Sequence, residues 1–193
     1  MGDHIMLRNA ATCGALVCDT SDKIQTHDEA YAVTTTDKPV GPQARSIFVI
    51  ERADDKDGSP DNCVHFGQKV RLTTNGNLMN RPLYLSSVAI TPQAFARFSR
   101  NQEVCVINQK VYSTVWQIIP VNGIQKDRLG EVIRADEPII LVHCATQQYL
   151  FSDKITYANM HGAEFEVSAI CAGTKSKTQI LANENKGTQV REN

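Results

Sequence analysis

The sequence contains no long apolar run and no excess of charge of one sign. Its 20 lysines and arginines balance 21 aspartates and glutamates, which leaves a formal net charge of -1. A membrane helix needs about 20 consecutive apolar residues, and no stretch of the chain approaches that length. Nucleic acids and anionic lipids attract strongly basic surfaces, which this balance does not provide. We therefore expect a soluble, cytoplasmic protein with no nucleic-acid partner and no membrane partner.

The cysteines lack the spacing of metal-binding or redox motifs. No two of them form a C-x-x-C pair, and the chain has no Asn-x-Ser/Thr acceptor for glycosylation. Most of them lie in or beside apolar segments, where a reduced cysteine packs as a small hydrophobic residue. These features favour reduced thiols in an intracellular protein over a disulfide framework. The six are Cys13, Cys18, Cys63, Cys105, Cys144 and Cys171.

Motifs of catalysis and of cofactor binding are also missing. The chain contains no G-x-S-x-G, P-loop, G-x-G-x-x-G or H-E-x-x-H pattern. His143 and Cys144 could be combined with His161 and Cys171 into a zinc set. Adjacent residues of a strand point to opposite sides, however, so His143 and Cys144 cannot readily reach one ion. The stretch "DDKDGSPD" at 54–61 begins like a calcium loop but lacks its later acidic ligands. We predict no enzyme, no catalytic residues, no cofactor and no metal.

What the chain does contain is a pattern that recurs. "GDHIML" at 2–7 and "FGQKVRL" at 66–72 share Gly-x-x-[Ile/Val]-x-Leu, displaced by 65 residues. "DEPIIL" at 136–141 repeats the apolar pair after a further 69 residues, with Asp136 in place of the glycine. Glycine and aspartate both tolerate turn conformations, so we expect this position to begin each unit with a turn and not to hold a ligand.

Three further apolar runs follow each copy of the pattern. They are short, alternate with period two, and are rich in β-branched and aromatic residues, which is typical of β-strands. Turn formers such as Asn75-Gly76-Asn77 separate them. The third runs contain Tyr31 and Val33, Val104 and Val106, and Phe165 and Val167, and the fourth are "SIFVI" at 46–50, "TVWQII" at 114–119 and "TQIL" at 178–181. The pattern predicts three units of four strands.

One segment of the middle unit looks helical. In "TPQAFARFSRN", Thr91–Asn101, Thr91 is a plausible N-cap, Pro92 suits the first helical position, and Phe95 and Phe98 are three residues apart. The middle unit is also eight residues longer than the others before its third strand. We predict that this insertion forms a short helix.

Three copies of four strands predict an all-β fold, a β-trefoil. In that fold each unit gives two strands to a closed barrel and a hairpin to its cap, so no long sheet edge is exposed. A β-sandwich with irregular strands would not predict the equal offsets. We predict one domain over 1–193, with repeats of approximately 2–66, 67–135 and 136–182 and a short polar tail at 183–193. The single tryptophan, Trp116, follows the strand alternation and is expected in the core.

Several segments resemble one family in particular. "VHFGQKVRL", "RPLYLSS", "EPIILVHCATQQYLFSD", "YANMHGAEFEVSAIC" and the "NENKGTQ" tail are similar to the cilia- and flagella-associated protein 161 family, over nearly the whole chain. The resemblance implies a MIR-like β-trefoil that acts as a structural microtubule inner protein in the axonemes of motile cilia and flagella. It implies α/β-tubulin and neighbouring inner proteins as partners, and no catalysis. By fold analogy alone, the alternative is a MIR-type or lectin-like module for a sugar or a phosphorylated ligand.

Three connecting segments are the candidates for partner contacts. Binding residues concentrate on variable loops that a rigid scaffold positions, and the candidates here are the insertions at 54–61, 91–101 and 122–131. The residues predicted to contact a partner are Asp54, Asp55, Lys56, Asp57, Arg97, Arg100, Lys126, Asp127 and Arg128.

Overall fold

The computed structural model describes residues 2–25, 28–38, 41–54, 61–121 and 128–171. Within these ranges the regular secondary structure is β-strand, as the predicted all-β class requires, apart from the short 3-10 helix η1 at Tyr112–Thr114. The strands are β1 (His4–Ile5), β2 (Ala15–Ile24), β3 (Ala30–Thr36), β4 (Phe48–Arg52), β5 (Lys69–Thr74), β6 (Tyr84–Ser87), β7 (Gln102–Ile107), β8 (Trp116–Pro120), β9 (Ile139–His143), β10 (Tyr149–Asn159) and β11 (Gly162–Ile170).

Eight of the strands form a closed barrel. From β5 the pairing passes through β6, β7, β3, β11, β10, β9 and β8, and β8 then pairs again with β5. The closing contact places Val70 opposite Trp116 and Lys69 opposite Gln117. β4 pairs with β5, and β1 pairs with β4, so both extend the sheet beside the ring. Closure satisfies the backbone groups that an open sheet edge would leave unpaired.

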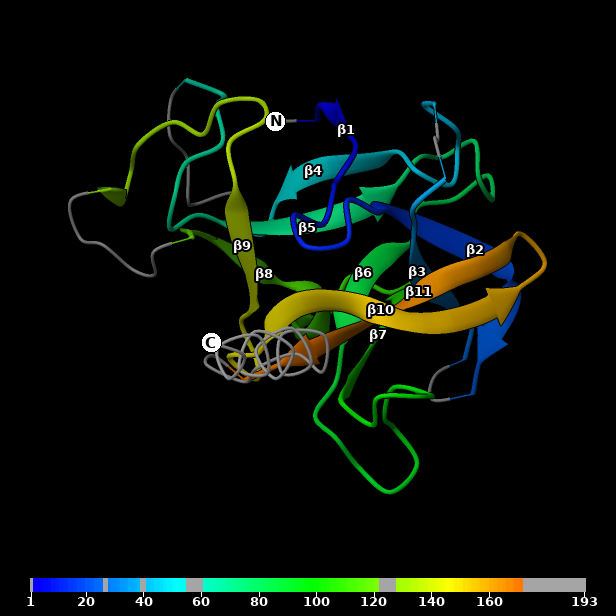
Figure 1. The fold of residues 1–193 in the computed structure, drawn as a ribbon. Helices are drawn as coiled ribbons and strands as arrows, with labels where there is room; N and C mark the ends of the chain where they lie inside the picture. Colours follow the sequence, from blue (N-terminus) through cyan, green and yellow to red (C-terminus); the bar gives the residue numbers. More distant parts are fainter. Residues whose placement is uncertain (1, 26–27, 39–40, 55–60, 122–127, 172–193) are drawn as a thin grey trace, which may run out of the picture.

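The remaining pairings join three hairpins into a cap. β2 pairs with β3, β6 with β7, and β10 with β11, and the second strands of the three hairpins also pair with one another in a triangle. In Figure 1 these six strands lie on one side of the molecule, and β1, β4, β5, β8 and β9 lie on the other. We call the first group the hairpin cap and the second group the barrel end.

One hydrophobic core runs through both groups. Trp116 is fully buried, as predicted, and its indole N–H donates to the Leu85 carbonyl at 2.9 Å. Phe48, Phe66 and Leu72 are also buried to 2% exposure or less. Burying each such side chain contributes roughly 1.5–3 kcal/mol relative to leaving it in water, so this core is the main driving force for closing the sheet.

The strands lie where the apolar runs predicted them. The four runs of the first unit correspond to β1–β4, those of the second to β5–β8, and the first three of the third to β9–β11. The last predicted strand, at 178–181, and the tail at 183–193 lie outside the described residues. The division of the chain into three repeats of four strands therefore stays a prediction.

The residue that begins each unit adopts the same unusual backbone conformation. Gly2, Gly67 and Asp136 have φ values of 83°, 87° and 64°. Side chains disfavour positive φ because Cβ approaches the following carbonyl, and glycine and aspartate are among the residues that tolerate it best. The backbone conformation expected at this position is present in all three places, and Gly67 and Asp136 also lie in turns.

The helix predicted over Thr91–Asn101 is wrong, because this segment is a loop of successive turns. Its start behaves as expected, since the Thr91 hydroxyl accepts from the Ala94 N–H at 3.0 Å. Further on, the N–H groups of Phe98 and Ser99 donate to the Glu166 carboxylate of β11 instead of to helical carbonyls. A tertiary contact from a distant strand therefore replaces the hydrogen bonds that would have continued the helix.

Candidate partner-binding pocket

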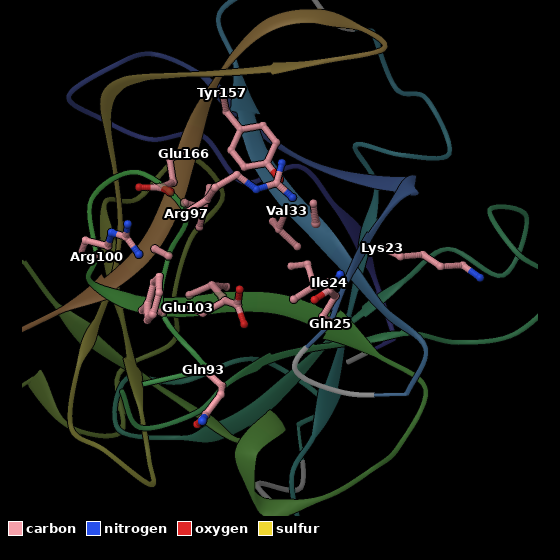
Figure 2. Close-up of a pocket in the computed structure, with 15 residues that line it drawn as sticks. Lys23, Ile24, Gln25, Val33, Gln93, Arg97, Arg100, Glu103, Tyr157 and Glu166 are labelled. Carbon is pink, nitrogen blue, oxygen red and sulfur yellow. The ribbon is translucent and has the colours of Figure 1, made fainter. Parts of the chain in front are cut away.

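The hairpin cap contains a pocket of about 400 Å³. Its walls come from the end of β2, the middle of β3, the 91–101 loop, the start of β7, Tyr157 of β10 and residues of β11. Figure 2 shows Arg100 on one side and Ile24 and Gln25 on the other, with Glu103 between them in this view. Every part of the wall belongs to the hairpin cap or to the loop inserted into it.

Arg97 attaches the 91–101 loop to the first and third hairpins. Its guanidinium nitrogens lie 3.2 and 3.3 Å from the two carboxylate oxygens of Asp22, and the guanidinium lies 4.9 Å from the centre of the Tyr157 ring. The Tyr157 hydroxyl donates to Asp22 at 2.5 Å. Burial raises the pKa of Tyr157, and the adjacent Asp22 carboxylate raises it further, so the phenol stays protonated and continues to donate.

Phe98 and Glu166 complete the attachment of the loop. The Phe98 ring meets the Tyr157 ring edge to face, with centroids 5.5 Å apart. The Glu166 side chain, on β11, is only 5% exposed, and its two oxygens accept from the N–H groups of Phe98 and Ser99 at 2.7 and 2.8 Å. Charge-assisted bonds of this kind are stronger than neutral ones, and they satisfy a buried carboxylate without a cation.

Arg100, unlike Arg97, has no acidic partner among the described residues. Its φ is 63°, its side chain is exposed, and its guanidinium stacks 4.4 Å above the Phe95 ring. No hydrogen bond or ion pair joins this guanidinium to an acidic side chain among the residues that the structure describes. The cation therefore faces the pocket with only an aromatic ring beneath it.

A buried ion pair joins β11 of the cap to the segment that precedes β4. Glu164 is 1% exposed and lies 3.0 Å from Arg45, and it also accepts from Thr34 at 2.5 Å and from Asn159 at 2.7 Å. Burial by itself raises the pKa of this carboxyl, but the bonds from Arg45, Thr34 and Asn159 outweigh burial and leave the pKa below its usual value. The pair is ionised at neutral pH.

The structure describes four of the nine residues predicted to contact a partner. Arg97 and Arg100 line the same pocket. Arg128 lies elsewhere, paired with Glu131 at 2.8 Å and Glu137 at 2.5 Å. Asp54 is exposed just after β4. The other five, Asp55, Lys56, Asp57, Lys126 and Asp127, lie outside the described residues. A contact with a partner stays a prediction for all nine.

Sequence reasoning missed the residues that hold Arg97 and the backbone of the 91–101 loop in place. Asp22, Tyr157 and Glu166 come from the first and third hairpins, and each reads locally as an ordinary strand residue. Only the pairing of β3, β7 and β11 brings them to the 91–101 loop. No local signal in the sequence could have grouped them.

The histidine considered for a zinc site serves the core instead. His143 is fully buried and lies against Trp116, with ring centroids 4.9 Å apart. Its Nε2 is 2.9 Å from the Ser113 carbonyl and therefore carries the proton, which leaves Nδ1 to accept from the Thr146 hydroxyl at 2.8 Å. Burial lowers the pKa of His143 despite the opposing effect of the Ser113 bond, so the ring is neutral at pH 7.

The described residues contain neither a metal-binding cluster nor a membrane-spanning helix. No three His, Cys, Asp or Glu side chains in this part of the chain are placed to share a metal ion. In the same residues, no helix has the length and apolar character needed to cross a membrane.

Comparison with known proteins gives one family and one fold. The sequence profile of the "cilia- and flagella-associated protein 161-like domain" matches residues 13–183. The chain is 28% identical over 162 residues to cilia- and flagella-associated protein 161 of Bos taurus, which covers 79% of this chain and 49% of the relative. The chain thus spans about half the length of that curated relative.

Solved structures resemble the whole fold. The SDF2-like protein of Arabidopsis thaliana superposes with a TM-score of 0.71 at 21% identity, covering 90% of this chain and 88% of the other. A Caenorhabditis elegans protein of unknown function gives 0.70 at 19% identity, covering 89% and 88%. At such identities the likeness concerns the fold alone, which is β-trefoil-like.

Proposed function

The chain belongs to the cilia- and flagella-associated protein 161-like family, and from this membership we propose that it is a structural microtubule inner protein of motile cilia and flagella. In this proposal it binds tubulin and neighbouring inner proteins in the lumen of axonemal doublet microtubules and supports their stability during beating. The observation that carries the proposal is the profile match over residues 13–183.

The architecture supports a role in binding rather than in turnover. The hairpin cap shares the hydrophobic core of the barrel end, and the 91–101 loop is attached to the cap by hydrogen bonds to β2 and β11 and by a ring contact with β10. A fixed loop loses little conformational entropy when a partner docks, which favours stable assembly. We propose that the protein is not an enzyme and that its surface residues serve contacts between proteins.

Location in the cell is the direct test. A tagged copy expressed in motile ciliated cells should remain with the axonemes after washing with high salt, and electron tomography should place the tag inside the doublet lumen. Residue-level crosslinking of the same axonemes should give links to tubulin or to inner proteins. A copy that spreads through the cytoplasm and is absent from washed axonemes would contradict the proposal.

A further inference from the structure

Two charged side chains of the cap pocket, Arg97 and Glu166, already have partners within the protein. Arg97 is held by both oxygens of Asp22, and the Glu103 carboxylate is close enough to act on it electrostatically. Glu166 is satisfied by two backbone N–H groups. Arg97 and Glu166 are therefore committed to holding the 91–101 loop in place and are not available to a ligand.

Arg100 also faces the pocket, but its guanidinium has no such partner in the described part of the chain. Its guanidinium has the Phe95 ring below it and no carboxylate beside it in the described part of the chain. Stacking on an aromatic ring orients the planar guanidinium while leaving its N–H groups free to bind a carboxylate in two-point fashion. Lys23 also borders the pocket, but in Figure 2 its side chain points away from the other residues.

The rest of the pocket wall combines apolar and polar side chains. Ile24 and Phe95 are half-buried and line the pocket, with Val33 near Ile24 in Figure 2. Gln25 and Gln93 are exposed and border it, and each offers amide donors and acceptors of the kind that bind a peptide backbone. A matching ligand combines an apolar side chain with one negative charge.

We propose that this pocket binds an acidic segment of a partner protein, in which a carboxylate that pairs with Arg100 lies next to an apolar side chain that packs on Ile24 and Phe95. The charge balance favours a carboxylate over a phosphate, because Glu103 and Glu166 also line the pocket and repel a doubly charged group more strongly. The proposal goes beyond a location in the axoneme, since it holds for whichever protein carries the segment.

Peptide titration followed by NMR tests the proposal directly. The probe is the peptide acetyl-Gly-Leu-Glu-Leu-Glu-Gly-amide, and its counterpart has glutamine in place of both glutamates. The acidic peptide should shift the backbone amide signals of residues 23–25, 93–100 and 103. The glutamine peptide should bind at least about ten-fold more weakly, because loss of the charge-assisted pairing with Arg100 costs on the order of one ten-fold step or more.

Variants assign the effect to one side chain. Arg100→Gln should weaken binding of the acidic peptide about ten-fold, whereas Arg100→Lys should retain part of it. The matched control is Arg8→Gln, since Arg8 is exposed on a different segment and has no described ion pair. The control should bind as the parent protein does, and the dispersion of the NMR spectrum shows that each variant is folded.

Three outcomes would overturn the proposal. They are equal binding of the two peptides, shifts confined to residues outside the pocket, and tighter binding of inorganic phosphate than of the acidic peptide at the same amides. The last would make the pocket a phosphate site. None of these results changes where the protein lies in the cell, so failure of the pocket and failure of the luminal role are distinguished by separate experiments.

Discussion

The barrel end and the hairpin cap share one hydrophobic core but bury different chemistry. Every carboxylate buried in the described residues lies on β2, β10 or β11 of the cap, and the strands of the barrel end bury none. The four are Asp19, Asp153, Glu164 and Glu166. Apolar burial is non-directional, whereas a buried charge requires specific partners. The barrel end is therefore held by packing, whereas in the cap directed bonds add to the packing and also shape its pocket.

Removal of a barrel-end aromatic should have the largest effect. Phe48 is fully buried on β4, so Phe48→Ala should lower the free energy of unfolding by about 3–5 kcal/mol through lost burial and the cavity left behind. The control is Ile90→Ala, at a side chain that is 58% exposed, which should change it by less than about 0.5 kcal/mol. Urea denaturation measures both, and similar values for the two variants would contradict a packed barrel end.

Loss of a buried cap carboxylate should be nearly as costly, for a different reason. Glu164→Ala leaves Arg45 without its ion-pair partner in a mostly buried position, which should cost about 3 kcal/mol. Glu131→Ala removes a 50% exposed carboxylate that also pairs with an arginine, and should cost about 0–1 kcal/mol.

A double variant tests whether the ion pair stabilises the cap through its charges or through the volume that its side chains fill. Glu164→Leu combined with Arg45→Met should recover most of the stability lost by Glu164→Ala, because an apolar pair leaves no unpaired charge. Thermal unfolding measures the recovery. A double variant as unstable as the single one would show that the bonds to Thr34 and Asn159 matter more than the ion pair.

Substitution at the turn that opens the second unit should have a smaller effect. Gly67 has a φ of 87°, and a Cβ placed there would lie 2.9 Å from the end of the Leu129 side chain. Gly67→Ala should cost about 1–2 kcal/mol, chiefly from the backbone conformation. Gly76→Ala, at a glycine with open space around it and no positive φ, should be neutral or slightly stabilising. Equal denaturation midpoints for the two variants would argue against a required turn.

Mild acid should produce the smallest loss of stability, through protonation of His143. Its folded pKa lies below the ordinary value of 6.5, so the unfolded chain binds the proton more readily. Stability should therefore fall as the pH drops through 6.5 and level off below the folded pKa. Glu164, whose pKa is also lowered, adds a further loss only below about 4.5, where the unfolded carboxyl begins to take up its proton.

Variants identify the group responsible. His143→Gln should flatten the dependence of the denaturation midpoint on pH between 7 and 5.5, whereas His4→Gln, at an exposed histidine, should leave its slope unchanged. An unchanged slope in His143→Gln would show that another group titrates.

The candidate site shows how far local sequence signals extend. Arg97 and Arg100 could be selected because the 91–101 segment is a charged insertion between two predicted strands. Their different roles could not be predicted, because Asp22 is 75 residues from Arg97 in the sequence. The two side chains meet only because the three hairpins pair with one another. The predicted helix failed for the same reason. Thr91 does cap a turn, but Glu166 takes the next backbone donors.

The sequence by itself determined the strands, their order and the turn residues that begin each unit. These features depend on period-two alternation and on backbone preference, which act over a few residues. Only the tertiary structure decided which charges meet. The distance between two side chains on different hairpins depends on the register of strands far apart in the chain. That register pairs Arg97 with Asp22 and leaves Arg100 facing the pocket without a partner among the described residues.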